Sequence, residues 1–583
     1  MILQALKEYY DRKAADPESN IAPEGWERKE IPFIILITPE GKFLRFEDTR
    51  EGGGKKKRGK VFLVPQGVKK AAGIKANLLW DVAGYVFGID TKGKPERAAS
   101  QRNAFLDRIH NELGQVPATQ SILKFLEDDN HSAFENDPLW SEIFETNPNL
   151  TFRVLGDDEL FCNLPDVMKE VGKKRDSTDQ TGNCLITGNV DSIARLHTAI
   201  KGVNGAQSVG ANIVSFNLDA FCSYNKRQGS NAPVGTNAMF AYTTALNTLL
   251  SRNSTQRMTI GDATTVFWSA KKTNFESDFS SFFSEPAKDD PDAATRAVRA
   301  LFSSIETGSY QNDNLATRFY VLGLSPNAAR ISIRFWQVAT IREISEKIKL
   351  HFSDLAIIKP PKEPEFYSLW RLLVNVASLD KSENILPNLA GEMVRAVLTG
   401  VPYPETLLHA ALRRIHSDVE HRVKPVRAAL LKAYLNRYFR VHPTHNHKEI
   451  EMSLDINQPS VGYQLGRLFA ALEKIQEDAS SGLNATIRER FYGSACATPV
   501  TVFANLLRLK NHHLAKLSSP GLVVKREKLL GEIMGRLSDF PPHLDLHEQG
   551  RFALGYYHQR QDFFASKGEK QNDVEAASGK EDR

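Results

Sequence analysis

Two hydrophobic patterns divide the chain. Up to about residue 364, short apolar runs bounded by turn residues predict strands. These runs are residues 31–38, 42–46, 60–64, 150–155, 212–216, 258–268, 318–324 and 331–336. Between them, stretches with apolar residues at helical spacing predict helices, among them residues 4–13, 96–113 and 237–250. The first part of the chain is therefore predicted to be mixed α/β.

After residue 365 the strand pattern disappears, and apolar residues recur at helical spacing. Glycine, proline and capping residues divide this part into roughly seven or eight helices. We therefore predict an α+β protein, with a mixed α/β N-terminal region followed by an all-α C-terminal helical bundle. The predicted parts are a basic α/β region at 1–115, its mixed α/β continuation at 116–364, a first helical part at 365–451, a second helical bundle at 452–565 and a disordered tail at 566–583.

Composition narrows the class of protein. The 583 residues are 41% apolar and 25% charged, which is typical of a folded chain and of neither a fibrous nor a wholly disordered one. The N-terminus lacks a signal-peptide pattern, and no apolar run is long enough to cross a membrane. The four cysteines are widely spaced, without the density of a disulfide scaffold. We expect a cytoplasmic protein with no membrane partner.

The strongest electrostatic feature is a basic segment near the N-terminus. Three glycines at 52–54 are followed by five basic residues, Lys55, Lys56, Lys57, Arg58 and Lys60, and the patch continues with Lys69, Lys70 and Lys75. Such a cluster can follow a phosphate backbone, and nucleic acid is the expected partner. Asn77 offers a donor and an acceptor that could read a base edge. The alternative is a solvated basic loop that serves solubility.

A second polar group lies further along the chain. Residues 217–231 are rich in hydrogen-bond donors, and strand alternation in 330–335 puts two arginines on one face, opposite Ile331, Ile333 and Phe335. We expect an RNA- or subunit-contact surface from Asn217, Tyr224, Lys226, Arg227, Gln228, Asn231, Arg330 and Arg334. Turn chemistry and an intrachain salt bridge are the alternatives.

The hypothesis that this protein is an enzyme rests on one histidine cluster. His442, His445 and His447 could bind a divalent metal in a metal-dependent nuclease, with Glu449 and Glu451 as the nearby carboxylates. Their loop spacing differs from the helical arrangement of known metal motifs, and no phosphate-binding loop, nucleophile elbow or kinase signature is present in the sequence. We therefore predict no catalytic residue, no metal and no cofactor. A pure protein scaffold is the third reading.

Several strings resemble one family. They are residues 1–6, 75–81 (Lys-Ala-Asn-Leu-Leu-Trp-Asp), 85–88, 184–188 (Cys-Leu-Ile-Thr-Gly), 200–202, 212–217, 322–330 (ending Ser-Pro-Asn-Ala-Ala-Arg) and 555–560 (Gly-Tyr-Tyr-His-Gln-Arg). With these strings the chain resembles the large subunit of the type I-C CRISPR surveillance complex (Cascade). Some members carry further cysteines before the Cys-Leu-Ile-Thr-Gly string, as in a zinc ribbon, whereas Cys184 here has no nearby partner. Asn225 stands where the family often has glycine.

The resemblance implies a noncatalytic subunit that recognises the protospacer-adjacent motif in double-stranded DNA, aids duplex opening and R-loop formation, and recruits a helicase-nuclease. Its other partners would be CRISPR RNA and the backbone, RNA-processing and small subunits of the complex, while guide pairing reads the target sequence. From the chemistry of the side chains, we expect Lys75 and Asn77 to contact the motif. Lys69 and Lys70 would bind the phosphates that flank it. The loop from Lys55 to Lys60 would steer the duplex.

The helical part raises two further expectations. Genes of this family also encode the small subunit from an internal start, and Met452, which precedes a whole set of predicted helices, is the expected start. The 452–565 bundle would then be small-subunit-like. Arg467 and Lys474, seven residues apart, are expected on an outward face that guides DNA, with a surface ion-pair network as the alternative.

Overall fold

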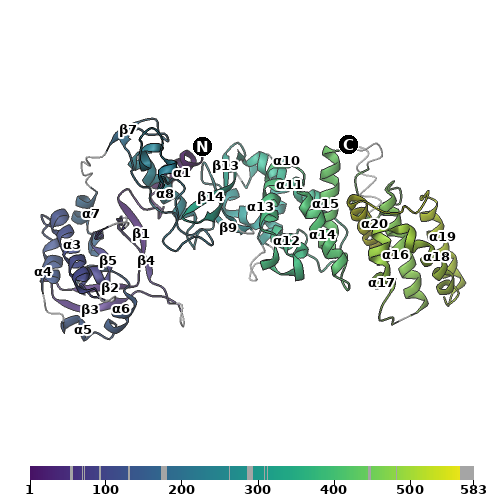
Figure 1. The fold of residues 1–583 in the computed structure, drawn as a ribbon, viewed down its shortest axis with the longest axis horizontal. Coiled ribbons are helices and arrows are strands. Elements are labelled where there is room, and N and C mark those ends of the chain that lie inside the picture. The colour runs from purple at the N-terminus through teal and green to yellow at the C-terminus, as the bar shows by residue number, and fades with distance from the viewer. Residues whose placement is uncertain are drawn as a thin grey trace. The chain divides into compact units, whose positions relative to one another are not determined.

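The computed structural model describes residues 1–52, 57–68, 70, 73–90, 94–128, 132–172, 180–260, 263–284, 293–307, 309–311, 313–443, 448–480 and 482–564. The chain is an α+β protein, as predicted, and among the described residues the strands are confined to the N-terminal part and only helices form in the C-terminal part (Figure 1). It divides into two compact units. The first holds residues 1–202, 207–251 and 328–330, and the second holds 203–206, 252–327 and 331–583.

This division is coarser than the one read from the sequence. The main division between the units falls near residue 251. The sequence analysis instead placed the boundary between the α/β part and the helical part at residues 364 and 365. The five predicted parts stay predictions.

The first unit is built on a four-stranded mixed sheet of order β3-β2-β6-β5. Its centre is β2, whose five residues Phe-Ile-Ile-Leu-Ile are all buried, with β6 parallel and β3 antiparallel to it. The elements of this unit are α1 (Ile2–Ala14), β1 (Trp26–Ile31), β2 (Phe33–Ile37), β3 (Phe43–Asp48), β4 (Lys60–Pro65), β5 (Trp80–Val82), α2 (Ala83–Val86), α3 (Pro95–Leu113), α4 (Thr119–Glu127), α5 (Ser132–Glu135), α6 (Trp140–Thr146), β6 (Asn149–Val154), α7 (Pro165–Val171), β7 (Thr181–Asn183), β8 (Val190–Ser192) and α8 (Thr236–Leu249).

The predicted strand at 212–216 is not formed. Ala211 and Asn212 make only isolated bridges, to Ile200 and Arg330, and the rest of the segment is irregular. The apolar residues that suggested a strand are spread through a loop with many polar residues, so no neighbouring strand pairs with it along its length.

The second unit begins with a four-stranded sheet of order β14-β13-β10-β9 and continues as helices. The predicted strand at 258–268 forms two strands, β9 and β10. The elements are β9 (Arg257–Ile260), β10 (Ala263–Ser269), α9 (Asn274–Asp278), α10 (Ala293–Thr307), β11 (Ser309–Tyr310), β12 (Asp313–Asn314), β13 (Arg318–Asn327), β14 (Arg330–Thr340), α11 (Ile341–Leu355), α12 (Leu369–Val376), α13 (Pro387–Thr399), α14 (Glu405–Ser417), α15 (Pro425–Val441), α16 (Val461–Ala479), α17 (Ile487–Ala497), α18 (Pro499–Leu514), α19 (Pro520–Met534) and α20 (Leu546–Phe564).

Helices α16 and α20 form the closest helix pair of the second unit, side by side in Figure 1. Three glycines allow this approach. A Cβ added at Gly466 would lie 2.0 Å from the carbonyl oxygen of Phe552, and one added at Gly555 would lie 2.0 Å from that of Tyr463. At Gly462 the carbonyl oxygen of Glu548 would be 2.3 Å away. The two backbones therefore touch where side chains would otherwise separate them.

The prediction that Arg467 lies on an outward basic face of α16 is wrong. Its side chain is fully buried and donates hydrogen bonds to Gln559 on α20 (3.1 Å) and Glu532 on α19 (3.0 Å). Lys474 pairs with Asp478 at 2.7 Å. Because α16 packs against α17, α18, α19 and α20, it has no broad solvent face, and its cations serve the bundle itself.

Candidate nucleic-acid interface

A two-stranded antiparallel ribbon, β1 paired with β4, includes Lys60, the last residue of the five-residue basic run. In its register Lys29 lies opposite Phe62, and Ile31 lies opposite Lys60. Side chains of directly opposite residues share a face, as do those two positions apart along a strand. Lys29, Phe62 and Lys60 therefore lie on one face of the ribbon, together with the buried Ile31 and Val64. We call the β1–β4 pair the basic ribbon.

Lysines alternate with aromatic rings along this face. The Lys60 Nζ lies 6.0 Å from the Phe62 ring centroid, and the Lys29 Nζ lies 4.8 Å from that of Trp80. Beyond the ribbon, the Lys70 Nζ lies 3.6 Å from the Tyr85 ring centroid. Cation–π contact holds ammonium groups in place without adding a negative charge beside them.

The loop that continues the basic ribbon has a fixed base. Glu51 and Arg58 exchange both backbone hydrogen bonds, at 2.9 and 3.2 Å. The Gly59 N–H donates to Glu30 Oε1 at 3.0 Å, and a Cβ at Gly59 would lie 2.6 Å from the backbone nitrogen of Pro32. Lys57, like Arg58, is exposed on this base. Lys55 and Lys56 lie outside the described residues.

Lys70 has a structural partner. Its Nζ donates to both carboxylate oxygens of Asp81, at 2.5 and 2.7 Å, and the Asp81 side chain is only 1% exposed. Burial lowers the pKa of Lys70, against the opposing attraction of Asp81. Much of its charge is therefore already balanced, which weakens the expectation of a phosphate contact at this residue. Lys69 lies outside the described residues.

The two residues expected to read the motif differ in exposure. Lys75 is exposed. Asn77 is only 5% exposed, its Oδ1 accepts the Val68 N–H at 3.0 Å, and its own N–H donates to Asp81 at 2.8 Å. The structure therefore turns Asn77 into the loop, where it holds the 68–81 segment together, and presents Lys75 alone to solvent.

The sequence analysis missed two lysines that join this site. Lys29 belongs to β1, and Lys201 comes from the distant end of the first unit, yet their charges interact. Burial is the main cause that lowers the pKa of Lys29, and repulsion by Lys201 adds to it. A bound anion would relieve that repulsion. Lys201 falls in the 200–202 string of the family resemblance, which was the available signal.

The second predicted group is an ordered loop system. Arg330 donates to Asn217 Oδ1 at 2.7 Å and its guanidinium stacks 4.1 Å from the Phe221 ring centroid. Gln228 accepts a hydrogen bond from Arg195 at 2.6 Å. Arg330, Asn217 and Gln228 thus make hydrogen bonds within the chain, without the salt bridge considered for Arg330, whereas Tyr224, Lys226 and Arg227 are exposed.

Strand β14 departs from the expected alternation. Ile331 is buried, but Ile333 is 42% exposed. Arg334 is exposed on β14 and belongs to the second unit, while Arg330 belongs to the first. As an edge strand of its sheet, β14 has neighbouring chain on one side only, so alternation alone overestimates its burial.

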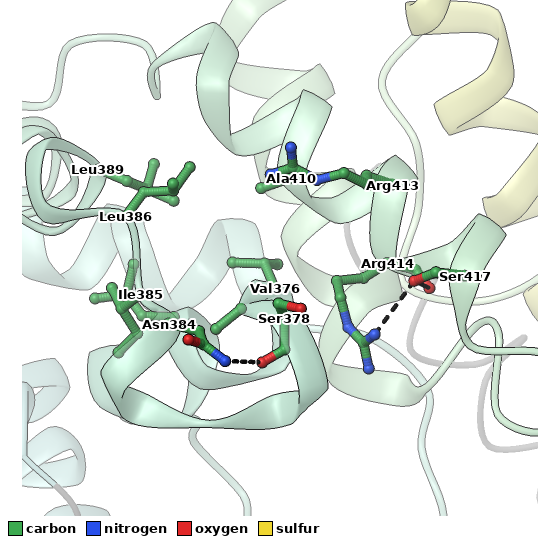
Figure 2. Close-up of a pocket in the computed structure, with 12 residues that line it drawn as sticks. Val376, Ser378, Asn384, Ile385, Leu386, Leu389, Ala410, Arg413, Arg414 and Ser417 are labelled. Carbon is green, nitrogen blue, oxygen red and sulfur yellow. Dashed lines mark hydrogen bonds between the residues drawn. The ribbon is translucent and has the colours of Figure 1, made fainter.

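The helical part holds a pocket of about 400 Å³ beside α14, shown in Figure 2. Ile385, Leu386 and Leu389 form part of its apolar wall. At the rim, Arg414 donates to Ser417 Oγ at 3.2 Å and pairs with Asp380 at 3.0 Å. The lining therefore combines an apolar wall with two arginines, Arg413 and Arg414, of which Arg414 is already paired with Asp380.

A second groove of the helical part has basic and aromatic lining, from the segment before α15, α17 and the end of α20. Two of its cations form salt bridges within the chain, Lys424 with Asp380 at 2.8 Å and Arg560 with Glu477 at 2.9 Å. Arg422 donates to the His416 carbonyl at 2.8 Å. The groove therefore favours the ion-pair alternative over a DNA path along the bundle.

The histidine cluster is only partly described. The His442 Nδ1 lies 3.1 Å from the Tyr438 carbonyl oxygen and its ring stacks on Tyr438, while His445 and His447 lie outside the described residues. Within the described ranges, no group of three His, Cys, Asp or Glu side chains is placed to hold a metal ion. Cys184 is buried and unpaired, without a disulfide.

These features define an α+β protein with a candidate nucleic-acid interface on its first unit. The chain belongs to the family of the CRISPR-associated protein (Cas_Csd1), whose model matches residues 6–564. This membership confirms the resemblance to the large subunit of type I-C Cascade, and with it a role as a CRISPR-associated subunit. No curated protein matches the chain. In the described part, no helix has the length and hydropathy needed to cross a bilayer.

Proposed function

We propose that this protein is the noncatalytic subunit that recognises the protospacer-adjacent motif in double-stranded DNA, aids duplex opening and R-loop formation, and recruits a helicase-nuclease. It would do so together with CRISPR RNA and the backbone, RNA-processing and small subunits of a type I-C complex. The basic ribbon carries the proposal. A two-stranded ribbon fits the major groove of B-DNA, and the alternating lysines and rings give it cations held in fixed positions.

The residues divide by task. Lys57, Arg58 and Lys60 would bind phosphates, since they lie on a fixed base and are exposed. Lys75 would contact the motif, since it is the exposed residue of the 75–77 pair. Asn77 would support the loop that presents Lys75, through its bond to Val68.

The first prediction is that the triple variant Lys57→Glu, Arg58→Glu, Lys60→Glu weakens duplex binding by the assembled complex for every sequence alike. We expect the affinity for duplex DNA to fall at least about tenfold. The magnitude of the slope of log affinity against log salt concentration should fall by about 3, since each phosphate contact contributes about 0.9.

Lys75→Ala should instead reduce the preference for the correct motif by about 1–3 kcal/mol. Binding titrations at several salt concentrations measure both.

Lys124→Glu, an exposed charge reversal on α4 of the same unit, is the matched control and should leave binding unchanged. If the triple variant binds like the control, the basic ribbon is not the interface. If Lys75→Ala keeps full motif discrimination, motif reading lies elsewhere.

We also propose that Met452 starts a second product, the small subunit. Met452 lies between α15 and α16, outside both helices, and residues 452–583 would form a chain of 132 residues. Helix α16 packs against α17, α18, α19 and α20, all of which this product would contain. The product therefore keeps its own core, and it exposes the face of α20 that packs on α15 in the full chain.

The second prediction concerns this start. Met452→Leu, combined with silent recoding of the Lys448 and Glu449 codons, should remove a short C-terminal polypeptide from purified complex and leave the full-length chain intact. Mass spectrometry of the complex measures both species. Met393→Leu, at the fully buried methionine inside α13, is the control and should leave the short polypeptide in place. Absence of any species beginning near Met452 in the unaltered complex would refute the internal start.

A further inference from the structure

The loop of residues 223–231, which we call the finger, has an unusual backbone. Tyr224 and Asn225 are consecutive left-handed residues, with φ of 52° and 59°, and Gln228 follows with φ of 47°. Left-handed conformations are costly for residues other than glycine, so they persist only where the surrounding structure enforces them. Strain of this kind is concentrated at functional positions.

Asn231 enforces the conformation. Its Nδ2 donates to the carbonyl oxygens of Lys226 and Gln228, both at 3.1 Å, and its Oδ1 accepts the Ser223 N–H at 3.0 Å. One side chain thus ties three points of the loop together. The tip between Ser223 and Gln228 has little freedom to relax.

The base of the finger is fixed to the rest of the first unit. The Gly229 N–H donates to the Arg195 carbonyl oxygen at 3.1 Å, and a Cβ at Gly229 would lie 2.1 Å from the Ala194 carbonyl oxygen. The Arg195 guanidinium also donates to Gln228 at 2.6 Å. The finger is therefore a stiff projection and not a loose loop.

The tip displays one aromatic ring beside two cations. Tyr224 is 95% exposed, and Asn225, Lys226 and Arg227 are exposed next to it. Within the described part of the chain, no ion pair holds either cation. A tyrosine kept almost wholly in water, next to Asn225, Lys226 and Arg227, differs from the desolvated centre of a protein-binding hot spot. A tyrosine ring beside two cations is complementary to a ligand that has a flat ring flanked by phosphates.

We propose that the finger stacks Tyr224 on an unpaired nucleobase while Lys226 and Arg227 bind the neighbouring phosphates. A paired base inside a duplex has no open face, so the ligand is a single-stranded nucleotide, from the guide RNA or from an opened DNA strand. The tied left-handed backbone fixes the position of the Tyr224 Cα before binding, which reduces the backbone entropy lost on contact. The inference rests on the proposed function, because it requires that the protein work in a nucleic-acid complex.

The test uses the assembled complex with guide RNA alone and with target DNA added. Short-wavelength ultraviolet crosslinking followed by mass spectrometry should find a nucleotide attached to the 223–231 peptide, and the arm in which it appears identifies RNA or DNA as its source. Tyr224→Ala should abolish the adduct and weaken binding of that strand about five- to hundredfold. Tyr224→Trp, which keeps a stacking ring, should restore binding.

Asn231→Ala tests the stiffness separately, because it leaves all tip side chains in place. We expect a smaller loss of binding than for Tyr224→Ala, with assembly intact by size-exclusion chromatography. Leu185→Ala, at a residue that is 69% exposed in the same unit, is the control and should change neither binding nor adduct.

Two results would overturn the inference: unchanged binding in Tyr224→Ala with no nucleotide on the finger peptide, or a crosslink from the finger to a partner subunit in place of a nucleotide. Either result leaves the proposed function standing if duplex binding still depends on the basic ribbon. Loss of the proposed function would show differently, as duplex binding that is indifferent to the ribbon triple variant.

Discussion

Gly466→Ala and Gly555→Ala should each destabilise the helical bundle by at least about 3 kcal/mol, because the new Cβ would meet a backbone carbonyl oxygen of the partner helix at 2.0 Å. A flexible side chain could move away from such a contact, but a helix backbone cannot move without separating α16 from α20. The helices would have to shift apart along their whole contact. Urea unfolding of the full chain, followed by circular dichroism, measures the loss.

Gly531→Ala is the matched control, since it is also a helical glycine of the bundle, on α19, and a Cβ there meets nothing within 4 Å. It should be neutral or stabilise the helix by up to about 1 kcal/mol. Equal effects at Gly531 and Gly466 would show that helix propensity, and not close packing, decides these positions. Because α16 and α20 both belong to residues 452–583, the same variants should also destabilise the proposed small subunit.

Asp354→Ala should cost about 3–5 kcal/mol of unfolding free energy, because it leaves the buried Arg437 without its carboxylate partner, while the more exposed Arg440 keeps Glu449. Asp354 Oδ2 accepts from Arg437 Nε and Oδ1 accepts from Arg440 Nη1, both at 2.6 Å. Arg437 is only 2% exposed, so water cannot replace the lost carboxylate. Urea unfolding at neutral pH measures the loss.

Glu365→Ala gives the comparison for an exposed pair. Glu365 bonds Arg299 at 2.6 Å, but the two side chains are 44% and 67% exposed. The cost should stay below about 1 kcal/mol. If the Asp354 and Glu365 variants lose similar stability, burial of the pair does not control its contribution.

The sequence by itself determined the order and type of most elements. Hydrophobic periodicity is a local property, so the helices at 4–13, 96–113 and 237–250 were found within a few residues of their observed bounds. The all-helical C-terminal part followed from the same pattern. The basic segment near residue 55 and the family strings are also local, and they gave the region of the candidate interface and the family.

Tertiary structure decided which polar side chains face solvent. Asn77 and Lys75 are two residues apart, yet one is buried under its loop and the other is exposed, because Asp81 and Val68 bind the first. Lys201 joins the basic ribbon from more than a hundred residues away, and Arg467 is enclosed because four helices surround α16. Periodicity shows which face of an element is apolar, but the exposure of a polar residue depends on the elements packed against it, and their positions follow from contacts distant in sequence.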